Sequence, residues 1–394
     1  MHWLGGVCHF PAMKPARFLR SLCFCAFLSR AVAVEWEMHR FEGRDYVTLE
    51  NIAAFYGFPK PAPVGPPSPA AITAIVAGAA SATEFGITTA ATLAAASRTL
   101  VLDSGALHLE VTPGLSEVNI NGVKQWLAFP VRVEDGRALV SRLDLGKIIE
   151  PRLRPELITG LQPVTTVVLD PGHGGHDRGA ISRFGFEKDF ALDVALRART
   201  LLEKAGYKVV MTRATDIFIP LEERASIANR IPNSIFVSIH FNASNSNSDA
   251  RGFEIFSIAP RGAPATNDSV PSERDLREEP GNAVELPSGA LAGSVFHALL
   301  GQMPMVDRGI KHARFAVLRL CERPAVLVEC GFVSNPAESS LISSGTWRAR
   351  IADAVADGVE NYRALAENGQ RPKTIADYRR AASGHLQLRE TAAP

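Results

Sequence analysis

The chain has 394 residues, enough for two domains of ordinary size, and 46% of them are apolar, which supports well-packed cores. Its formal net charge is +1 at pH 7, and the sequence contains no basic arm and no long run of like charge. Binding to nucleic acid or to an anionic surface through overall charge is therefore not expected.

The N-terminus has the three parts of an export signal. A basic region of one lysine and two arginines precedes an apolar core at 21–28 and an Ala-x-Ala cleavage site at 31–33. We expect the signal, residues 1–33, to be removed and the protein to reach the periplasm or the cell envelope. The start is Met1 or Met13. The apolar core is too short for a stable membrane span.

Residues 34–160 predict a small α+β domain rich in antiparallel strands. A short strand at 44–49 and a helical segment at 50–56 come first, and an Ala-rich stretch at 70–97 follows as a weak helix or a solvated insertion. Four further strands are predicted at 99–102, 107–111, 118–120 and 126–133. The dipeptides Asn121-Gly122 and Asp135-Gly136 between apolar runs are strong hairpin signals.

This part resembles the small N-terminal domain of copper amine oxidases, which recurs on bacterial envelope proteins. The likeness rests on Tyr46-Val47-Thr48-Leu49, Asn121-Gly122-Val123 and Ala138-Leu139-Val140-Ser141. It brings no metal site, so we expect an interaction or spacer module, joined to the rest by a proline-bracketed linker.

From residue 164 the pattern changes to alternating strands and helices, which predicts an α/β domain at 164–366 with a mostly parallel sheet and helices on both faces. Strands are expected at 167–169, 209–211, 235–239, 253–257 and 326–328. Helices are expected at 187–205, 221–230, 291–301 and 346–365. A polar tail, 367–394, follows.

Four chemically capable side chains lie where this sheet would bind a ligand. His173, His240 and Glu329 follow or end strands, and Glu187 opens a helix where the chain has returned to the same edge. Each alone also fits an ordinary role, as a turn histidine, a helix N-terminal carboxylate or a core histidine. Together, two imidazoles and a carboxylate suffice to hold catalytic zinc, and a second carboxylate can transfer protons.

The flanking residues, from 164 to 362, resemble the zinc-dependent N-acetylmuramoyl-L-alanine amidases, cell-wall hydrolases that cut the bond between muramic acid and its stem peptide. The matching motifs are Asp170-Pro171-Gly172-His173-Gly174-Gly175, Glu187-Lys188-Asp189, Ser238-Ile239-His240-Phe241-Asn242 and Val328-Glu329-Cys330-Gly331-Phe332. The resemblance implies one Zn²⁺ bound by His173, Glu187 and His240, with Glu329 as the catalytic carboxylate. Phe241 and Cys330 stand where the family more often has a small residue.

The resemblance also implies peptidoglycan as the substrate and an envelope activator protein as a candidate partner, and we expect a monomer. Two alternatives stay open. One is a zinc peptidase that cuts within the stem peptide, and the other is a non-catalytic wall-binding protein on the same scaffold. The position of the cut bond distinguishes the peptidase from an amidase. Turnover on peptidoglycan distinguishes an enzyme from the wall-binding protein.

Other polar residues receive structural interpretations. Asp177 is expected to tie down its loop or to hydrogen-bond a ligating imidazole. A structural polar network is expected from Arg213, Asp216, Arg224 and Asn229. His176 is expected to be a solvated rim residue, and His297 and His312 are expected to be surface or packed side chains.

Two further features are left with open interpretations. Cys321 and Cys330 remain after removal of the signal, and their pairing is undecided. Residues 261–288 are long and polar for a connection, so they form a regulatory cover over the groove or a solvated loop with few apolar residues to dock it.

Overall fold

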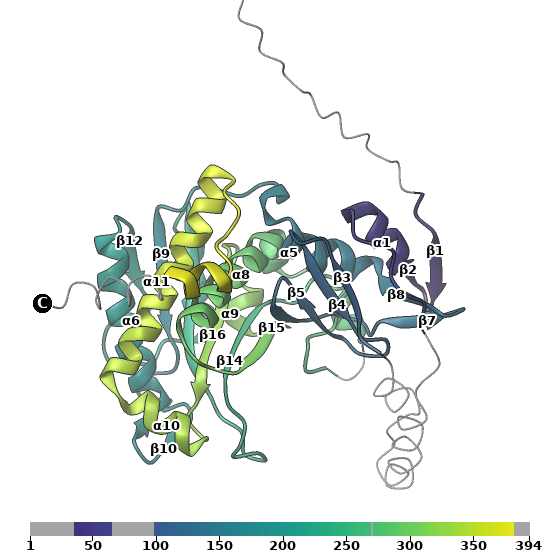
Figure 1. Cartoon of the computed structure of the whole chain (residues 1–394). Helices are drawn as coiled ribbons and strands as arrows, with labels where there is room; N and C mark the ends of the chain where they lie inside the picture. The colour runs from purple at the N-terminus through teal and green to yellow at the C-terminus, as the bar shows by residue number, and fades with distance from the viewer. Residues whose placement is uncertain (1–34, 65–97, 269–270, 382–394) are drawn as a thin grey trace, which may run out of the picture. The chain divides into compact units, whose positions relative to one another are not determined.

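The computed structural model describes residues 35–64, 98–268 and 271–381 (Figure 1). The expected export signal at 1–33 and the Ala-rich stretch at 70–97 lie outside the described residues, as does the end of the polar tail.

The first sheet consists of four antiparallel strands. They are β1 (Met38–Phe41), β2 (Arg44–Thr48), β7 (Arg132–Glu134) and β8 (Arg137–Ser141), in the order β1-β2-β8-β7. Helix α1 (Leu49–Tyr56) follows β2, begins with the side chain of Thr48 capping its first turn and ends at Gly57 in the left-handed conformation. The predicted hairpin at Asp135-Gly136 joins β7 to β8.

Four more antiparallel strands follow in the chain. They are β3 (Leu100–Asp103), β4 (His108–Val111), β5 (Glu117–Ile120) and β6 (Val123–Trp126). The predicted hairpin at Asn121-Gly122 joins β5 to β6, with both residues at positive φ. These strands extend the large sheet formed by the later part of the chain, because Gln125 of β6 pairs with Ile310.

A helical run leads from β8 toward the larger domain. It comprises α4 (Arg142–Asp144), the π-helical η1 (Leu145–Ile149), α5 (Glu150–Leu153) and the 3₁₀ turn η2 (Pro155–Leu157). The buried carboxylate of Asp144 accepts the backbone N–H groups of Ala128 at 2.6 Å and Phe129 at 3.2 Å. The strand predicted at 126–133 is therefore wrong, because these amides bond a side chain instead of a neighbouring strand.

The large sheet has ten strands in the order β12-β9-β13-β16-β14-β15-β6-β5-β4-β3. Its strands after residue 164 are β9 (Thr166–Pro171), β12 (Lys208–Met211), β13 (Ser234–Asn242), β14 (Phe253–Ile258), β15 (Asp307–Ala313) and β16 (Ala325–Phe332). The run β12-β9-β13-β16 is parallel, whereas β14 is antiparallel to β16. This confirms the predicted mostly parallel α/β sheet preceded by an antiparallel part, although β15 was not predicted. A separate small hairpin pairs β10 (Ile181–Ser182) with β11 (Gly185–Phe186).

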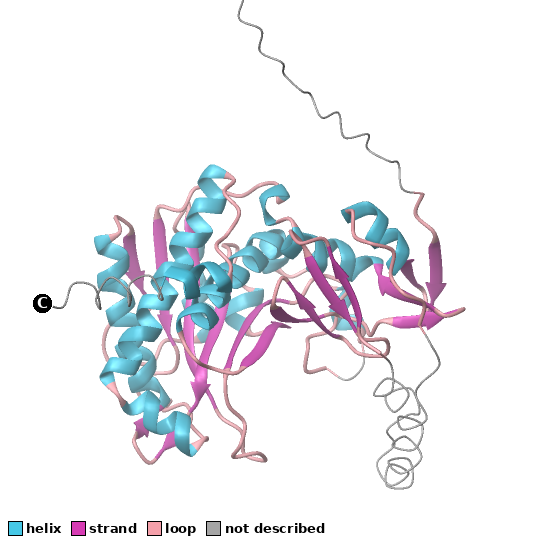
Figure 2. Cartoon of the chain, viewed as in Figure 1, coloured by secondary structure: helices cyan, strands magenta, loops and turns pink. Residues whose placement is uncertain are grey.

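Helices cover both faces of this sheet (Figure 2). The large core lies under α6 (Glu187–Lys204), α8 (Glu285–Gln302) and α11 (Gly345–Asn368), and the smaller core lies under α7 (Leu221–Asn229) and α9 (Ala316–Arg319). α10 (Pro336–Ser343) links β16 to α11. Helices α8 and α11 approach closely at Gly358, where a Cβ atom would lie 2.5 Å from the Cα of Val295. Each fully buried aliphatic side chain in these cores contributes roughly 1.5–3 kcal/mol.

One described helical stretch, Pro280–Gln302, is long and apolar enough to cross a membrane. Most of that stretch is buried inside the protein, as is typical of a core helix. Its apolar residues therefore have a packing role in the large core.

The segment 261–288 is docked by polar contacts. It contains the 3₁₀ turns η3 (Glu273–Leu276) and η4 (Pro280–Val284). Arg314 holds it, since its guanidinium pairs with the buried carboxylate of Asp275 at 2.9 Å and donates to the carbonyl of Ala263 at 2.7 Å. Most side chains from 271 to 278 are exposed, as the solvated-loop interpretation expects, but the ion pair of Arg314 with Asp275 docks the described part of the segment on the protein.

The described part of the expected polar tail packs on the protein. Tyr378 is 8% exposed, its hydroxyl donates to the carbonyl of Asp357, and its Cβ occupies the space beside Gly301. Residues 371–381 therefore cover α8 and α11.

Candidate metal centre

The carboxyl ends of three adjacent parallel strands bring the candidate residues together. His173 follows β9, His240 lies near the end of β13 and Glu329 lies in β16, directly beside His240 in the strand register. Glu187 is the first residue of α6 and reaches the same edge.

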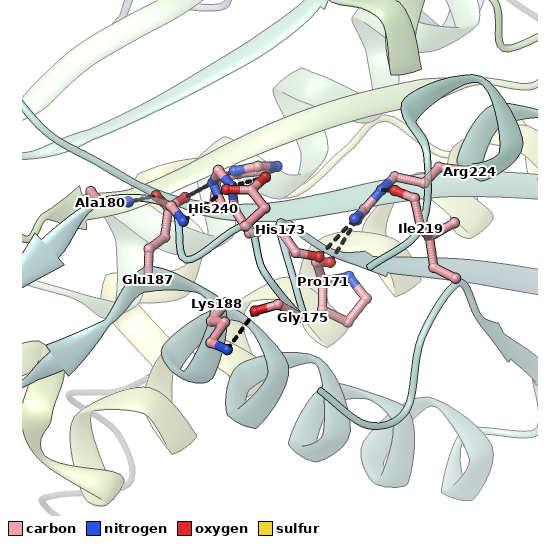
Figure 3. A network of polar contacts seen from close by, with 12 residues as sticks. Pro171, His173, Gly175, Ala180, Glu187, Lys188, Ile219, Arg224 and His240 are labelled. Carbon is pink, nitrogen blue, oxygen red and sulfur yellow. Dashed lines mark hydrogen bonds and ion pairs between the residues drawn. The ribbon is translucent and has the colours of Figure 1, made fainter. Parts of the chain in front are cut away.

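Three of these side chains point their donor atoms at one another (Figure 3). Glu187 Oε1 lies 3.0 Å from Nε2 of His173 and 2.9 Å from Nδ1 of His240. One donor atom from each residue lies within 4.8 Å of the others. Two imidazoles and one carboxylate are a donor set that can hold a metal ion.

Asp177 orients the first imidazole. Nδ1 of His173 donates to the Asp177 carboxylate at 2.9 Å, which leaves Nε2 directed at the cluster. The same carboxylate accepts the backbone N–H of Gly179 at 3.0 Å. Asp177 therefore performs both of the structural roles expected from the sequence. His176, next to it, is exposed as expected, and its ring lies beside that of Phe218.

Two glycines make the room in which the cluster fits. A Cβ atom on Gly172 would lie 2.3 Å from the imidazole of His240, and one on Gly179 would lie 2.6 Å from both Glu187 Oε2 and the ring of His173. Gly172 thus makes room for His240, and His173 itself takes a positive φ of 59°.

The Glu187 carboxylate is held in its charged form. Its side chain is 6% exposed, and burial alone would raise its pKa, but hydrogen bonds to His173 and His240 outweigh burial and lower the pKa. The backbone N–H groups of Phe241 and Ala180 also donate to its two oxygens, at 3.1 and 2.8 Å. The pKa of His173 is raised, since burial lowers it less than the neighbouring carboxylates of Glu187 and Asp177 raise it.

Glu329 lies in a different environment. Its Oε2 is buried and has no hydrogen-bond partner among the described residues. Burial raises its pKa well above the usual range, and the negative charges of Glu187 and Glu254 add to this, while Lys311 opposes it. A carboxyl group of this kind holds a proton more tightly than an exposed one, which suits an acid–base role.

A buried arginine network supports the loop that carries His173. Arg224 pairs with Asp170 at 2.9 Å and donates to the carbonyls of Pro171 and His173 at 2.8 and 2.7 Å (Figure 3). Arg213 donates to the Gly172 carbonyl at 2.7 Å. These contacts confirm the structural interpretation of both arginines.

Of the other two members expected in that network, Asp216 supports the same loop and Asn229 lies elsewhere. Asp216 accepts from the ammonium of Lys188 at 2.6 Å and from the N–H of Gly175 at 2.8 Å, so it also holds the loop. Asn229 instead caps the connection between α9 and β16 through Leu320 and Glu322.

A cavity of about 600 Å³ opens over the cluster and Glu329. Its walls are mainly apolar, from Phe218, Leu221, Phe241, Phe315, Val317 and Leu327. The sequence did not reveal these wall residues, because they come from four separate segments that only the fold brings together. Within the described chain, no residue of 261–288 lines this cavity. Cys321 and Cys330 are both buried free thiols.

Fold and site together define an α/β protein with a candidate metal centre at the carboxyl ends of its parallel strands. The model of a family described as N-acetylmuramoyl-L-alanine amidase matches residues 167–361. The N-acetylmuramoyl-L-alanine amidase AmiC of Neisseria meningitidis serogroup B is 35% identical over 224 residues, which cover 52% of this chain and 53% of that protein. AmiA of Escherichia coli K12 is 35% identical over 218 residues, which cover 50% of this chain and 75% of AmiA.

Among solved structures, the N-acetylmuramoyl-L-alanine amidase AmiC2 of Nostoc punctiforme shares 32% identity with a TM-score of 0.42, covering 50% of this chain and 96% of that one. The chain spans about half the length of the Neisseria relative and three quarters of AmiA. On the strength of the sequence matches, this chain belongs to the N-acetylmuramoyl-L-alanine amidase family.

Proposed function

We propose that this protein is a zinc-dependent hydrolase that cuts the amide bond between N-acetylmuramic acid and the L-alanine of the stem peptide in peptidoglycan. The observation that carries the proposal is the convergence of His173, Glu187 and His240 beside Glu329, in a chain that belongs to the amidase family. The glycine-lined space around the donor atoms supports the fit of an ion.

His173 through Nε2, His240 through Nδ1 and Glu187 through Oε1 would hold the metal. Zinc bound there would supply a Lewis acid that polarises the scissile carbonyl and lowers the pKa of a water molecule. The low pKa of Glu187 favours this role, since a ligand must be deprotonated.

Glu329 moves the proton in this scheme. Its carboxylate takes a proton from the attacking water as the water oxygen bonds to the lactyl carbonyl carbon. The same carboxyl group then delivers the proton to the L-alanine nitrogen as the C–N bond breaks. The products are the free carboxylate of the muramic acid and an intact stem peptide with a free amino terminus.

The apolar walls of the cavity would exclude water from the reacting groups and pack against the substrate. Phe218 and Phe315 are 39% and 40% exposed, which leaves both rings available for contact. Because peptidoglycan lies outside the cytoplasmic membrane, the proposal includes export directed by residues 1–33.

Two variants test the division of roles. His240→Ala removes a ligand and should lose both zinc and turnover. Glu329→Gln keeps the shape of the side chain but cannot accept a proton, so zinc should stay while turnover on purified peptidoglycan falls by at least about 10²-fold. Metal content, a thermal melt and peptide release are measured on both variants and on the parent.

If Glu329→Gln lost its zinc or kept near-normal turnover, Glu329 would not be the proton carrier. If the zinc-loaded parent released nothing from peptidoglycan, the enzymatic proposal itself would fail and a wall-binding role would replace it.

A further inference from the structure

A second cavity, of about 800 Å³, lies apart from the candidate metal centre. Its walls come from the β3–β4 and β5–β6 turns, from α5 and α8, and from the packed segment 371–380. It shares no lining residue with the cavity over the metal centre, so any ligand bound there would not occupy that centre.

The charged groups of this lining are mostly basic. The basic side chains are Arg152, Arg371, Arg379 and Arg380, together with His108. The acidic group in the lining is Asp103, which already pairs with His108 at 2.9 Å. Asp377, which lies next to the lining, is engaged by Arg380 and by the N–H of Thr374. Positive charge therefore exceeds negative charge around the cavity.

The side chain of Arg152 packs against two glycines of α8. A Cβ atom on Gly289 of α8 would lie 3.1 Å from Nη1 and 3.3 Å from Nη2 of Arg152, and one on Gly293, a turn later, would lie 3.9 Å from its Cδ. The side chain therefore lies along the helix with its guanidinium in space that the missing Cβ of Gly289 leaves open, and it makes ordinary contact at Gly293.

The guanidinium of Arg152 lacks a counterion. Nε donates to the amide oxygen of Gln125 at 3.3 Å, and no carboxylate of the described residues forms an ion pair with the group. Burial lowers its pKa to about 10, which still leaves it charged at neutral pH. Arg152 is partly buried, and a charge that is withdrawn from water is normally paired, because an unpaired one is costly.

We propose that this cavity binds a small ligand through a phosphate or carboxylate group that pairs with the terminal nitrogens of Arg152. The planar guanidinium can form bidentate hydrogen bonds with either a phosphate or a carboxylate. The other arginines of the lining add attraction at longer range, and the volume is ordinary for a small-molecule site. The ligand is thus an organic phosphate or a carboxylic acid.

The test is calorimetric titration of the full chain with glycerol phosphate and, separately, with succinate. Neither probe chelates zinc strongly, and comparison of the two separates a phosphate ligand from a carboxylate ligand. We expect saturable binding of at least one probe, with one site per chain, that weakens as salt is raised.

Two variants place this binding at Arg152. Arg152→Gln should weaken it by about tenfold or more, since a hydrogen-bonded charge pair is lost. Gly289→Ala should also weaken it, because the new methyl group displaces the guanidinium while alanine favours the helix.

Matched controls make the same chemical changes elsewhere. Arg40→Gln removes an exposed arginine, and Gly146→Ala adds a methyl group where nothing lies within 4 Å. Both should bind as the parent does, and His240→Ala should too, since the metal centre is not involved.

Absence of binding by both probes would overturn the proposal. So would equal binding by Arg152→Gln and Arg40→Gln, or loss of binding in His240→Ala. If Arg152→Gln did not fold, the comparison of Gly289→Ala with Gly146→Ala would decide, and equal affinities would overturn the proposal.

Discussion

Replacing Gly179 by alanine should weaken zinc binding far more than the same replacement at a glycine remote from the metal centre. The new Cβ atom would lie 2.6 Å from Glu187 Oε2 and 2.6 Å from the ring of His173. Ordinary van der Waals contact begins at 3.4 Å. Each of the two proposed ligands must therefore move about 0.8 Å away from the new methyl group. Metal–ligand distances tolerate only about 0.2 Å.

The expected result is a loss of zinc affinity of at least about 10–100-fold, the size of effect seen when the support of a ligand is removed. The backbone contributes separately, since φ at Gly179 is +63° and alanine there costs roughly 1–2 kcal/mol of stability. Competition with a chelator of known affinity measures the first effect, and urea unfolding of the zinc-free protein measures the second.

Gly369→Ala is the matched control. Its φ is +61°, and nothing lies within 4 Å of its added Cβ, so it carries the same backbone cost without touching a ligand. The two variants should lose similar stability and differ strongly in zinc affinity. Equal zinc affinities would refute the reasoning that the glycine holds space for the ligands.

Two further predictions concern stability. Burial lowers the pKa of His312 to about 3, against about 6.5 in the unfolded chain. As the pH falls, the unfolded state therefore binds a proton before the folded state does. The free energy of unfolding should drop by up to about 5 kcal/mol between pH 6.5 and 3. His312→Gln should flatten that pH dependence in urea unfolding, and an unchanged slope would contradict it. Gly358→Ala should lower stability by about 1–2 kcal/mol, because the backbone of Val295 cannot move aside, and a raised melting temperature would contradict that.

The alternating elements of the second domain followed from the sequence, whereas β15 did not. Its residues include Arg308 and Lys311, which break the apolar pattern expected of a buried strand. Both cations pair with the buried carboxylate of Glu254 on β14, at 2.9 and 2.6 Å. Such compensation depends on a contact between strands far apart in sequence, so no local pattern reveals it.

In the site, too, local patterns were informative, whereas contacts between distant segments were not. Its four residues could be named because each stands at the end of a strand or the start of a helix, within a motif typical of the family. The positions of Gly172 beside His240 and of Phe315 in the cavity wall required the packing of separate segments. The sequence therefore predicts which chemical groups form the site, and the structure adds the space around them.

Digestion of purified peptidoglycan followed by mass analysis tests the central claim most directly. The zinc-loaded protein should release intact stem peptides that begin with L-alanine and leave glycan strands without peptide, and a chelator should abolish the release. Fragments cut within the stem peptide, with L-alanine still attached to muramic acid, would contradict the account and favour a peptidase.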